Sequence, residues 1–230
     1  MKKTVCTIIT NNKDDSFCKL LKQNNLHHVE IVPTDLNDIN FLKNLEDNKI
    51  TISSIQGLLY GLTGSLSDET TWNSCFKRIK DIHKQSILFN IKYYVFGSPS
   101  WRTIPVKEDK LRKFLYELKG LEDQLHINLC FENCCSDYGS NILNTYSQVE
   151  TLCSELKLSY MLDRSSFIAE KEINIVKEPM HFHVSEFNFT GCPESLEHIF
   201  NFKTTEYCAL ECKLSKNIVK DIEMFGNLIA

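Results

Sequence analysis

The stretch Ile127–Glu132 reads INLCFE, and it indicates the fold of the chain. Its apolar residues alternate with Asn128, Cys130 and Glu132. A period of two is typical of a β-strand, and one apolar face suits contact with a layer of helices. The other face, which ends in a carboxylate, suits the interior of a barrel. The stretch therefore predicts a strand whose carboxyl end places Glu132 in a barrel mouth.

Further short β-rich runs occur on both sides of this strand, and segments with helical periodicity separate them. One such segment carries Trp72, Phe76, Ile79 and His83 at steps of three to four residues, and a short helix is expected around Ser166 to Lys171. Strands that alternate with helices pair in parallel, and eight of them predict closure. We therefore expect an α/β protein, a single-domain (β/α)₈ TIM barrel over residues 1–230. The other expected strands are Thr4–Thr10, His28–Pro33, Ile50–Ile55, Tyr93–Gly97, Ser159–Asp163, Met180–Ser185 and Tyr207–Cys212.

The same alternation, applied to the last three strands, turns Asp163, His183 and Glu211 inward. From Glu132 these residues follow at steps of 31, 20 and 28 positions, each close to one strand-helix unit. Barrel active sites lie at the carboxyl ends of the strands, so the four side chains are expected to meet there. Taken singly, each has an ordinary alternative: a surface or capping carboxylate, or a hydrogen-bonded core histidine. His181, two residues before His183, is expected to lie deeper and to support or pack.

Three carboxylates that converge in a partly buried mouth repel one another unless a cation compensates them. Together with one imidazole they form a hard, oxygen-rich ligand set. Such a set favours Mn²⁺ or Mg²⁺, and it is also compatible with Co²⁺ or Zn²⁺. The sequence therefore predicts one divalent metal ion held by Glu132, Asp163, His183 and Glu211.

Composition limits the partners that can be expected. The chain has 230 residues and a net charge of −4, which argues against a nucleic-acid backbone as partner. No run approaches the roughly 18 apolar residues of a membrane span, and the N-terminus is interpreted as a strand rather than a signal peptide. The ten cysteines are expected to be reduced packing residues of a cytoplasmic protein, because their spacing is not that of a zinc site.

Polar residues near other strand ends are candidates for binding substrate. Gln56 follows the third strand and is expected either to bind a substrate hydroxyl or to cap a loop. Ser98 lies in a turn whose N–H groups suit an anion. Trp101 suits an apolar pocket wall or packing under the loop, and Arg102 either binds a phosphate or carboxylate or is a surface cation. Glu186 and Asn188 are expected to shape the pocket rim.

At these positions the sequence resembles the xylose isomerase-like barrels, the sugar phosphate isomerase/epimerase superfamily. The resemblance implies a (β/α)₈ barrel with one divalent metal, in which Glu132 and Glu211 also act as acid and base. It implies isomerisation or epimerisation of a sugar or sugar phosphate through an enediolate that the metal stabilises. Relatives are often dimers, so it also points to a homodimer. The matching pieces, in order, are SSIQGLLYG (53–61), VFGSPSWR (95–102), LCFEN (129–133), MLD (161–163), HFHVSE (181–186) and ALE (209–211).

Two departures from the superfamily pattern leave alternatives open. Many relatives have a histidine where this chain has Ser166, and some epimerases have an arginine where it has Phe189. A metal-dependent lyase or dehydratase would use the same chemistry, and a catalytically silent ligand-binding barrel would need neither group. A phosphodiesterase of the endonuclease IV type is disfavoured, because few of the seven histidines fall at strand ends.

Overall fold

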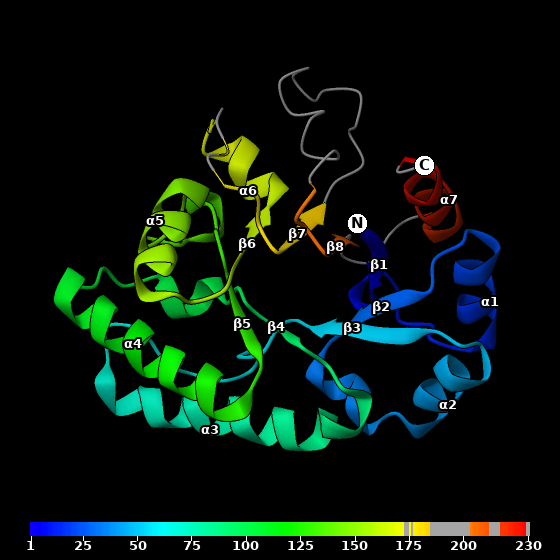
Figure 1. The fold of residues 1–230 in the computed structure, drawn as a ribbon, viewed down its shortest axis with the longest axis horizontal. Coiled ribbons are helices and arrows are strands. Elements are labelled where there is room, and N and C mark those ends of the chain that lie inside the picture. Colours follow the sequence, from blue (N-terminus) through cyan, green and yellow to red (C-terminus); the bar gives the residue numbers. More distant parts are fainter. Residues whose placement is uncertain (173–174, 176, 185–202, 212–216, 229–230) are drawn as a thin grey trace.

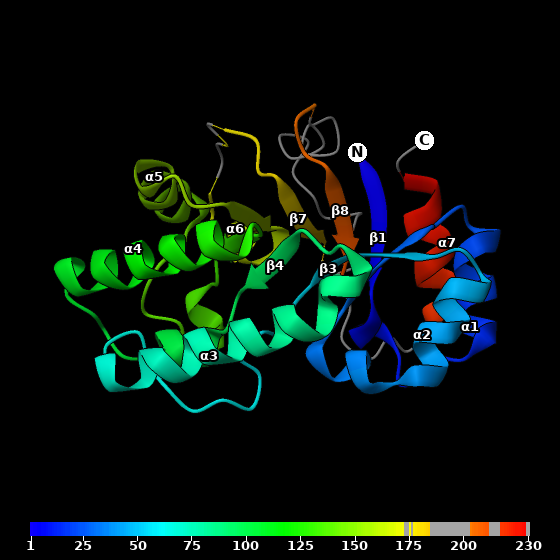
Figure 2. The ribbon, with the colours of Figure 1, turned by 60° about the horizontal axis from the view of Figure 1, so that its bottom comes forward.

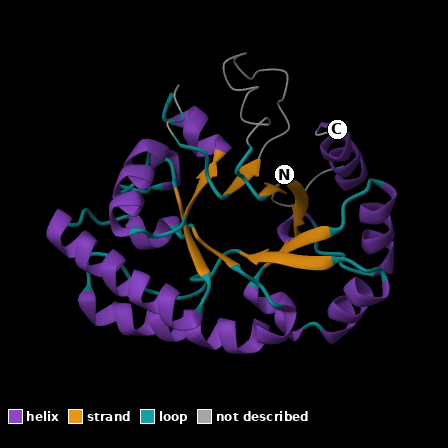
Figure 3. Ribbon diagram, viewed as in Figure 1, coloured by secondary structure: helices purple, strands orange, loops and turns teal. Residues whose placement is uncertain are grey.

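The computed structural model describes residues 1–172, 175, 177–184, 203–211 and 217–228. Within these residues eight parallel strands pair in chain order and close on themselves, the last against the first. The strands form a ring at the centre of the molecule, with helices outside it (Figures 1 and 3). They are β1 (Lys2–Cys6), β2 (His28–Ile31), β3 (Thr51–Ile55), β4 (Tyr93–Phe96), β5 (Asn128–Glu132), β6 (Tyr160–Asp163), β7 (His181–Val184) and β8 (Tyr207–Leu210). The expected (β/α)₈ barrel is confirmed.

The helices of the described residues cover the outside of this ring, and α3 and α4 run side by side along it (Figure 2). The helical period of Trp72, Phe76 and Ile79 falls on α3, as expected, with Trp72 and Ile79 buried. The helices are α1 (Asp15–Gln23), α2 (Ile39–Asp47), α3 (Glu69–Ser86), α4 (Glu108–Leu125), α5 (Tyr146–Leu156), α6 (Arg164–Ala169) and α7 (Ile218–Leu228). None of them is long and apolar enough to cross a membrane.

Packing inside the ring confirms which strand residues were expected to face the barrel interior and which the helices. Cys130 and Met161 lie in a small inner cluster with Tyr93, Val95 and Tyr207. The large core between strands and helices holds strand residues of the opposite phase, namely Leu129, Phe131, Leu162, Phe182 and Leu210. Since side chains alternate along a strand, the positions that follow the inner cluster at the carboxyl ends also face inward.

The predicted bounds of several elements were wrong, and β1 and the helix after β6 show why. The first strand was expected to run from Thr4 to Thr10, but β1 ends at Cys6 and residues Thr7–Ile9 form a 3₁₀ turn. The β-branched residues there favour a strand, yet the β1 pairing ends opposite Glu30, and the Thr7 hydroxyl donates to the carboxylate of Asp35. The helix after β6 begins earlier than expected, at Arg164, because Asp163 caps it.

Candidate metal centre

Glu132, Asp163, His183 and Glu211 meet at the carboxyl end of the barrel. Each offers one ligand atom, and these four atoms lie within 4.8 Å of one another. Strand register produces the convergence, because Asp163 pairs with His183 across β6 and β7, while Glu132 pairs with Met161 one layer below Asp163. Asp163 and His183 are buried, and the two glutamates are half-buried at the mouth. The predicted cluster is therefore assembled at the predicted depth.

His183 lies at the centre of this cluster. Its Nδ1 atom is 2.9 Å from Oε1 of Glu132 and 3.0 Å from Oε2 of Glu211. Its Nε2 atom faces the opposite way and lies 2.7 Å from Oε1 of Glu30. These separations place charged groups in contact, but the ring N–H bonds do not point along them, so they are ion pairs rather than aligned hydrogen bonds. Nδ1 is therefore the nitrogen that lies beside the carboxylates of Glu132 and Glu211.

The three carboxylates of the cluster repel one another unless positive charge lies between them. Burial raises the pKa of Glu132 to about 7, against the opposing attraction of His183. Burial alone would lower the pKa of His183, but the surrounding carboxylates of Glu30, Glu211 and Glu132 hold it well above its ordinary value. Without a cation, the site thus keeps protons that a divalent ion would replace. Three carboxylates and one imidazole fit a divalent cation in both charge and donor type.

Local structure positions the side chains of Glu132 and Asp163 in this cluster. Gly97 follows β4 on the inward phase, and a Cβ atom there would overlap Oε2 of Glu132. The missing side chain is therefore what leaves room for the Glu132 carboxylate. Asp163 caps α6, where its Oδ1 accepts from the Ser166 N–H at 2.6 Å and from the Ser165 hydroxyl at 2.7 Å. The capping alternative for Asp163 thus holds together with its place in the cluster.

Glu30 is a site residue that the sequence interpretation missed. It lies fully buried in β2, with the imidazoles of His181 and His183 against its two oxygens. Burial by itself would raise the pKa of Glu30, but these histidines hold it well below its ordinary value. A signal was present, because Val29, Glu30 and Ile31 alternate as the strand-five residues do. His181 has the deeper, supporting position expected for it.

Two buried polar side chains hold the carboxyl ends of the strands together. Asn133 accepts from the N–H of Asp163 at 2.7 Å and donates to its carbonyl at 3.1 Å, which joins β5 to β6 where each strand contributes a residue to the cluster. Arg102 donates from Nη1 to the carbonyl of Glu132 at 2.6 Å and from Nη2 to that of Phe96 at 2.8 Å.

The alternative that Arg102 is a surface cation is wrong. The side chain is fully buried, and its Nη1 and Nη2 atoms donate to main-chain carbonyls, while its Nε atom has no hydrogen-bond partner among the described residues. Binding of a phosphate or carboxylate by Arg102 stays a prediction. Its guanidinium also lies 4.4 Å from the centre of the Phe131 ring. Arg102 is the last residue of the 3₁₀ turn Pro99–Arg102, and its side chain folds back against the ends of β4 and β5. Arg102 therefore has a structural role.

Replacing Asn133 with alanine is expected to lower the free energy of unfolding by about 1–3 kcal/mol, because it leaves two buried main-chain groups of Asp163 without these partners. Urea unfolding monitored by circular dichroism measures the change. The exposed Asn141, which donates to the carbonyl of Thr103, supplies a control, and its alanine variant should stay within about 0.5 kcal/mol of the parent. Equal stability of the Asn133 and Asn141 variants would refute the joining role.

The remaining predicted contacts are placed as follows. The Trp101 indole is buried and donates to the carbonyl of Leu62 at 3.0 Å, which is the packing alternative. Gln56 is buried at the end of β3, and its amide nitrogen has no hydrogen-bond partner among the described residues. Ser98 begins the turn after Gly97 with a left-handed φ of 46°. Glu186 and Asn188 lie outside the described residues.

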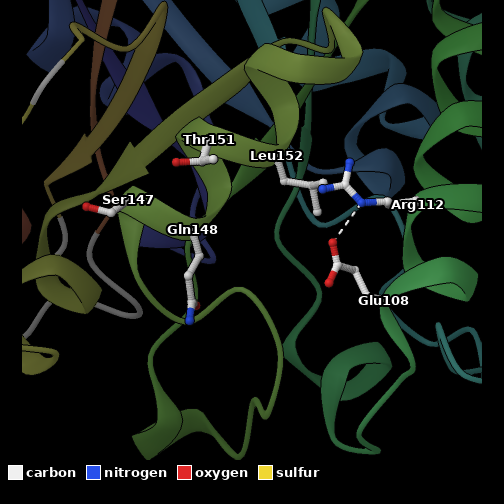
Figure 4. A pocket seen from close by; sticks show the side chains of 6 residues that line it. All are labelled: Glu108, Arg112, Ser147, Gln148, Thr151 and Leu152. Carbon is white, nitrogen blue, oxygen red and sulfur yellow. Dashed lines mark hydrogen bonds and ion pairs between the residues drawn. The ribbon is translucent and has the colours of Figure 1, made fainter.

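A separate pocket lies on the outer face, between α4 and α5. None of the four converging residues lines it, and its charged residues Glu108 and Arg112 already pair with each other at 2.9 Å (Figure 4). The pocket is thus distinct from the candidate metal centre. Its lining residues are Glu108, Arg112, Ser147, Gln148, Thr151 and Leu152.

No protein-family model and no curated protein matches the chain, but many solved structures do. A 3-keto-D-glucoside 4-epimerase from E. coli gives a TM-score of 0.72 at 16% identity, over 98% of each chain. A xylose isomerase domain containing protein from Salmonella typhimurium gives 0.71 at 14% identity, over 99% of this chain and 95% of that one.

An AP endonuclease of family 2 from Brucella melitensis gives 0.72 at 11% identity, over 97% of both chains. The likeness therefore reaches a protein that acts on nucleic acid, and the expected absence of such a partner here stays a prediction. At these identities the likeness concerns the fold. The chain folds as a (β/α)₈ TIM barrel similar to these solved structures.

Proposed function

We propose that this protein is a divalent-metal-dependent isomerase or epimerase that acts on a sugar or a sugar phosphate through an enediolate intermediate. One observation carries the proposal: the carboxylates of Glu132 and Glu211 both contact the Nδ1 atom of His183 at the barrel mouth, 2.9 Å and 3.0 Å away. The likeness in fold to a 3-keto-D-glucoside 4-epimerase supports the substrate class, while the reaction is argued from the site.

The chemistry assigns a role to each member of the cluster. Asp163 and His183, together with the two glutamates, would hold the metal, which supplies Lewis acidity toward neighbouring substrate oxygens when bound. One glutamate removes a carbon-bound proton and the other returns a proton. Opposed carboxylates on the two faces of a planar intermediate produce an epimer. A single carboxylate that moves the proton between adjacent carbons produces an isomer.

Two residues at neighbouring strand ends are proposed to bind the substrate hydroxyls. The Gln56 amide nitrogen is buried without a partner among the described residues, which is costly for a donor unless a ligand accepts from it. Ser98 follows Gly97, where a Cβ atom would overlap Oε2 of Glu132, so the turn lies beside this carboxylate. Arg102 and Trp101 are left out of this proposal, because both Nη atoms of Arg102 and the indole nitrogen of Trp101 donate to main-chain carbonyls.

Incubation of the metal-loaded protein in D₂O with a panel of ketoses and ketose phosphates tests the function. We expect proton NMR to show deuterium at a carbon next to the carbonyl, together with a new epimer or isomer. Loss of water to an unsaturated product would instead identify the dehydratase alternative. A protein that binds metal and catalyses no exchange across the panel would contradict the enzyme proposal and favour the silent binding barrel.

A further inference from the structure

Glu30 forms a buried network directly behind the candidate metal centre. Its Oε1 accepts from the Cys6 thiol, with 2.9 Å between sulfur and oxygen, and its Oε2 accepts from the Ser54 hydroxyl at 2.6 Å. The Nε2 atom of His181 lies 2.9 Å from the same Oε2. Glu30 itself is fully buried. A carboxylate removed from water in this way is stabilised only by such partners.

The strands are arranged so that these partners reach Glu30. The pairing of β2 with β3 shifts register between Val29 and Glu30, which is the signature of a β-bulge. Beyond this shift Ser54 stands opposite Glu30, and its hydroxyl turns inward to the carboxylate. Cys6 pairs with Glu30 on the other side. The carboxylate is thus held from both neighbouring strands and from β7 across the barrel.

The fourth neighbour of Glu30 is the imidazole of His183, on the side away from the other ligands. Nε2 of His183 lies 2.7 Å from Glu30, whereas Nδ1 lies 2.9 Å from Glu132. A histidine that binds a metal through one nitrogen carries its proton on the other, and an acceptor beside that proton fixes the tautomer and the ring orientation. Glu30 stands beside Nε2 at 2.7 Å, and its charge attracts a proton there although the N–H bond does not point straight along this separation.

Given the proposed metal site, on which this inference rests, we propose that Glu30 is a positioning residue for His183. It holds the ring so that Nδ1 stays beside Glu132 and Glu211, where a metal would bind, and Nε2 stays beside Glu30. Cys6, Glu30 and His183 also lie close enough together to suggest a second metal site. The existing donors argue against it, because Cys6, Ser54 and His181 already direct hydrogen bonds to the Glu30 oxygens.

Titration of the metal-free protein with Co²⁺, followed by visible absorption, tests this role. The wild type is expected to bind one Co²⁺ per chain. Glu30→Gln, which keeps the shape and removes the charge, is expected to raise the dissociation constant about 10- to 100-fold and to alter the Co²⁺ spectrum. Ser54→Ala removes one hydrogen bond to Glu30, and it should change the dissociation constant and the spectrum in the same direction but by less. This second variant keeps the proposal testable if Glu30→Gln does not fold.

Glu122→Gln is the matched control. Glu122 is also a buried carboxylate, but it lies on α4, where it accepts from the Leu129 N–H at 2.7 Å and contacts Lys119 at 2.8 Å. Its replacement should lower stability and leave Co²⁺ affinity and spectrum unchanged. A general loss of stability would affect both variants, whereas a positioning role affects only Glu30→Gln.

The outcomes separate the two proposals. A wild type that binds no Co²⁺ would overturn the metal site, and the positioning role with it. A wild type that binds Co²⁺, with Glu30→Gln and Ser54→Ala equal to it in affinity and spectrum, would overturn the positioning role alone. Two ions per wild-type chain, with one lost in Glu30→Gln, would also overturn it and would identify Glu30 as a ligand of a second ion.

Discussion

Replacement of Glu132 by glutamine is expected to slow turnover about 10²- to 10⁴-fold on any sugar that the wild type converts. The amide keeps the shape of the side chain but can neither remove nor return a proton at pH 7. Burial raises the pKa of Glu132 to about 7 without a cation, and a bound divalent ion would lower it, which favours the carboxylate form that removes a proton. Deuterium exchange at the carbon next to the carbonyl, measured by NMR, gives the rate.

The measurement is made at saturating metal, so that weaker metal binding does not imitate a lost proton transfer. Glu122→Gln serves again as the control, because it makes the same change in a buried carboxylate on the outer helix α4. It should retain wild-type turnover. If Glu132→Gln, with metal bound, exchanged deuterium as fast as the wild type, Glu132 would not be an acid or base of the reaction.

A second large effect is expected at Gly97. An alanine there would place its Cβ atom against Oε2 of Glu132, so the carboxylate must move. Displacement of a reacting group by about 1 Å lowers rates about 10²-fold, and the displaced oxygen is also a candidate metal ligand. We therefore expect Gly97→Ala to lose about 10²-fold in turnover and to bind metal more weakly, with the barrel still folded.

Gly120→Ala is the control for this change. Gly120 lies within α4, and a Cβ atom there would meet nothing within 4 Å. Alanine favours a helix over glycine by about 0.5–1 kcal/mol, so this variant should be more stable, with unchanged turnover. Thermal unfolding measures the stability of both variants, and the rate of deuterium exchange into the sugar measures their turnover. Wild-type turnover in Gly97→Ala would show that the Glu132 carboxylate does not need the space.

The fold and the four converging residues could be predicted from the sequence because both follow from strict periods. A strand turns every second residue inward, and each strand-helix unit repeats at a similar length, so the four residues could be placed together at the barrel mouth. Glu30 follows the same rule in β2. It was missed because the alternation was followed only through the last four strands.

Other features depend on contacts that no short pattern contains. Arg102 comes to lie inside the protein because carbonyls at the ends of β4 and β5 lie above the turn that carries it. The end of β1 at Cys6 is set by its pairing partners rather than by the β-branched residues that follow. Trp101 packs against Gly64, where a Cβ atom would overlap the indole. These outcomes are set by tertiary packing, which overrides local propensity.

The metal content of the purified protein tests the central claim most directly, with the wild type and Glu211→Gln analysed side by side by mass spectrometry. We expect close to one Mn²⁺, Co²⁺ or Zn²⁺ per wild-type chain, after reconstitution if needed, and loss of most of it in the variant, because Glu211 is one of the four converging residues. No bound metal in the wild type after reconstitution with any of these ions, or equal metal in both proteins, would contradict this claim.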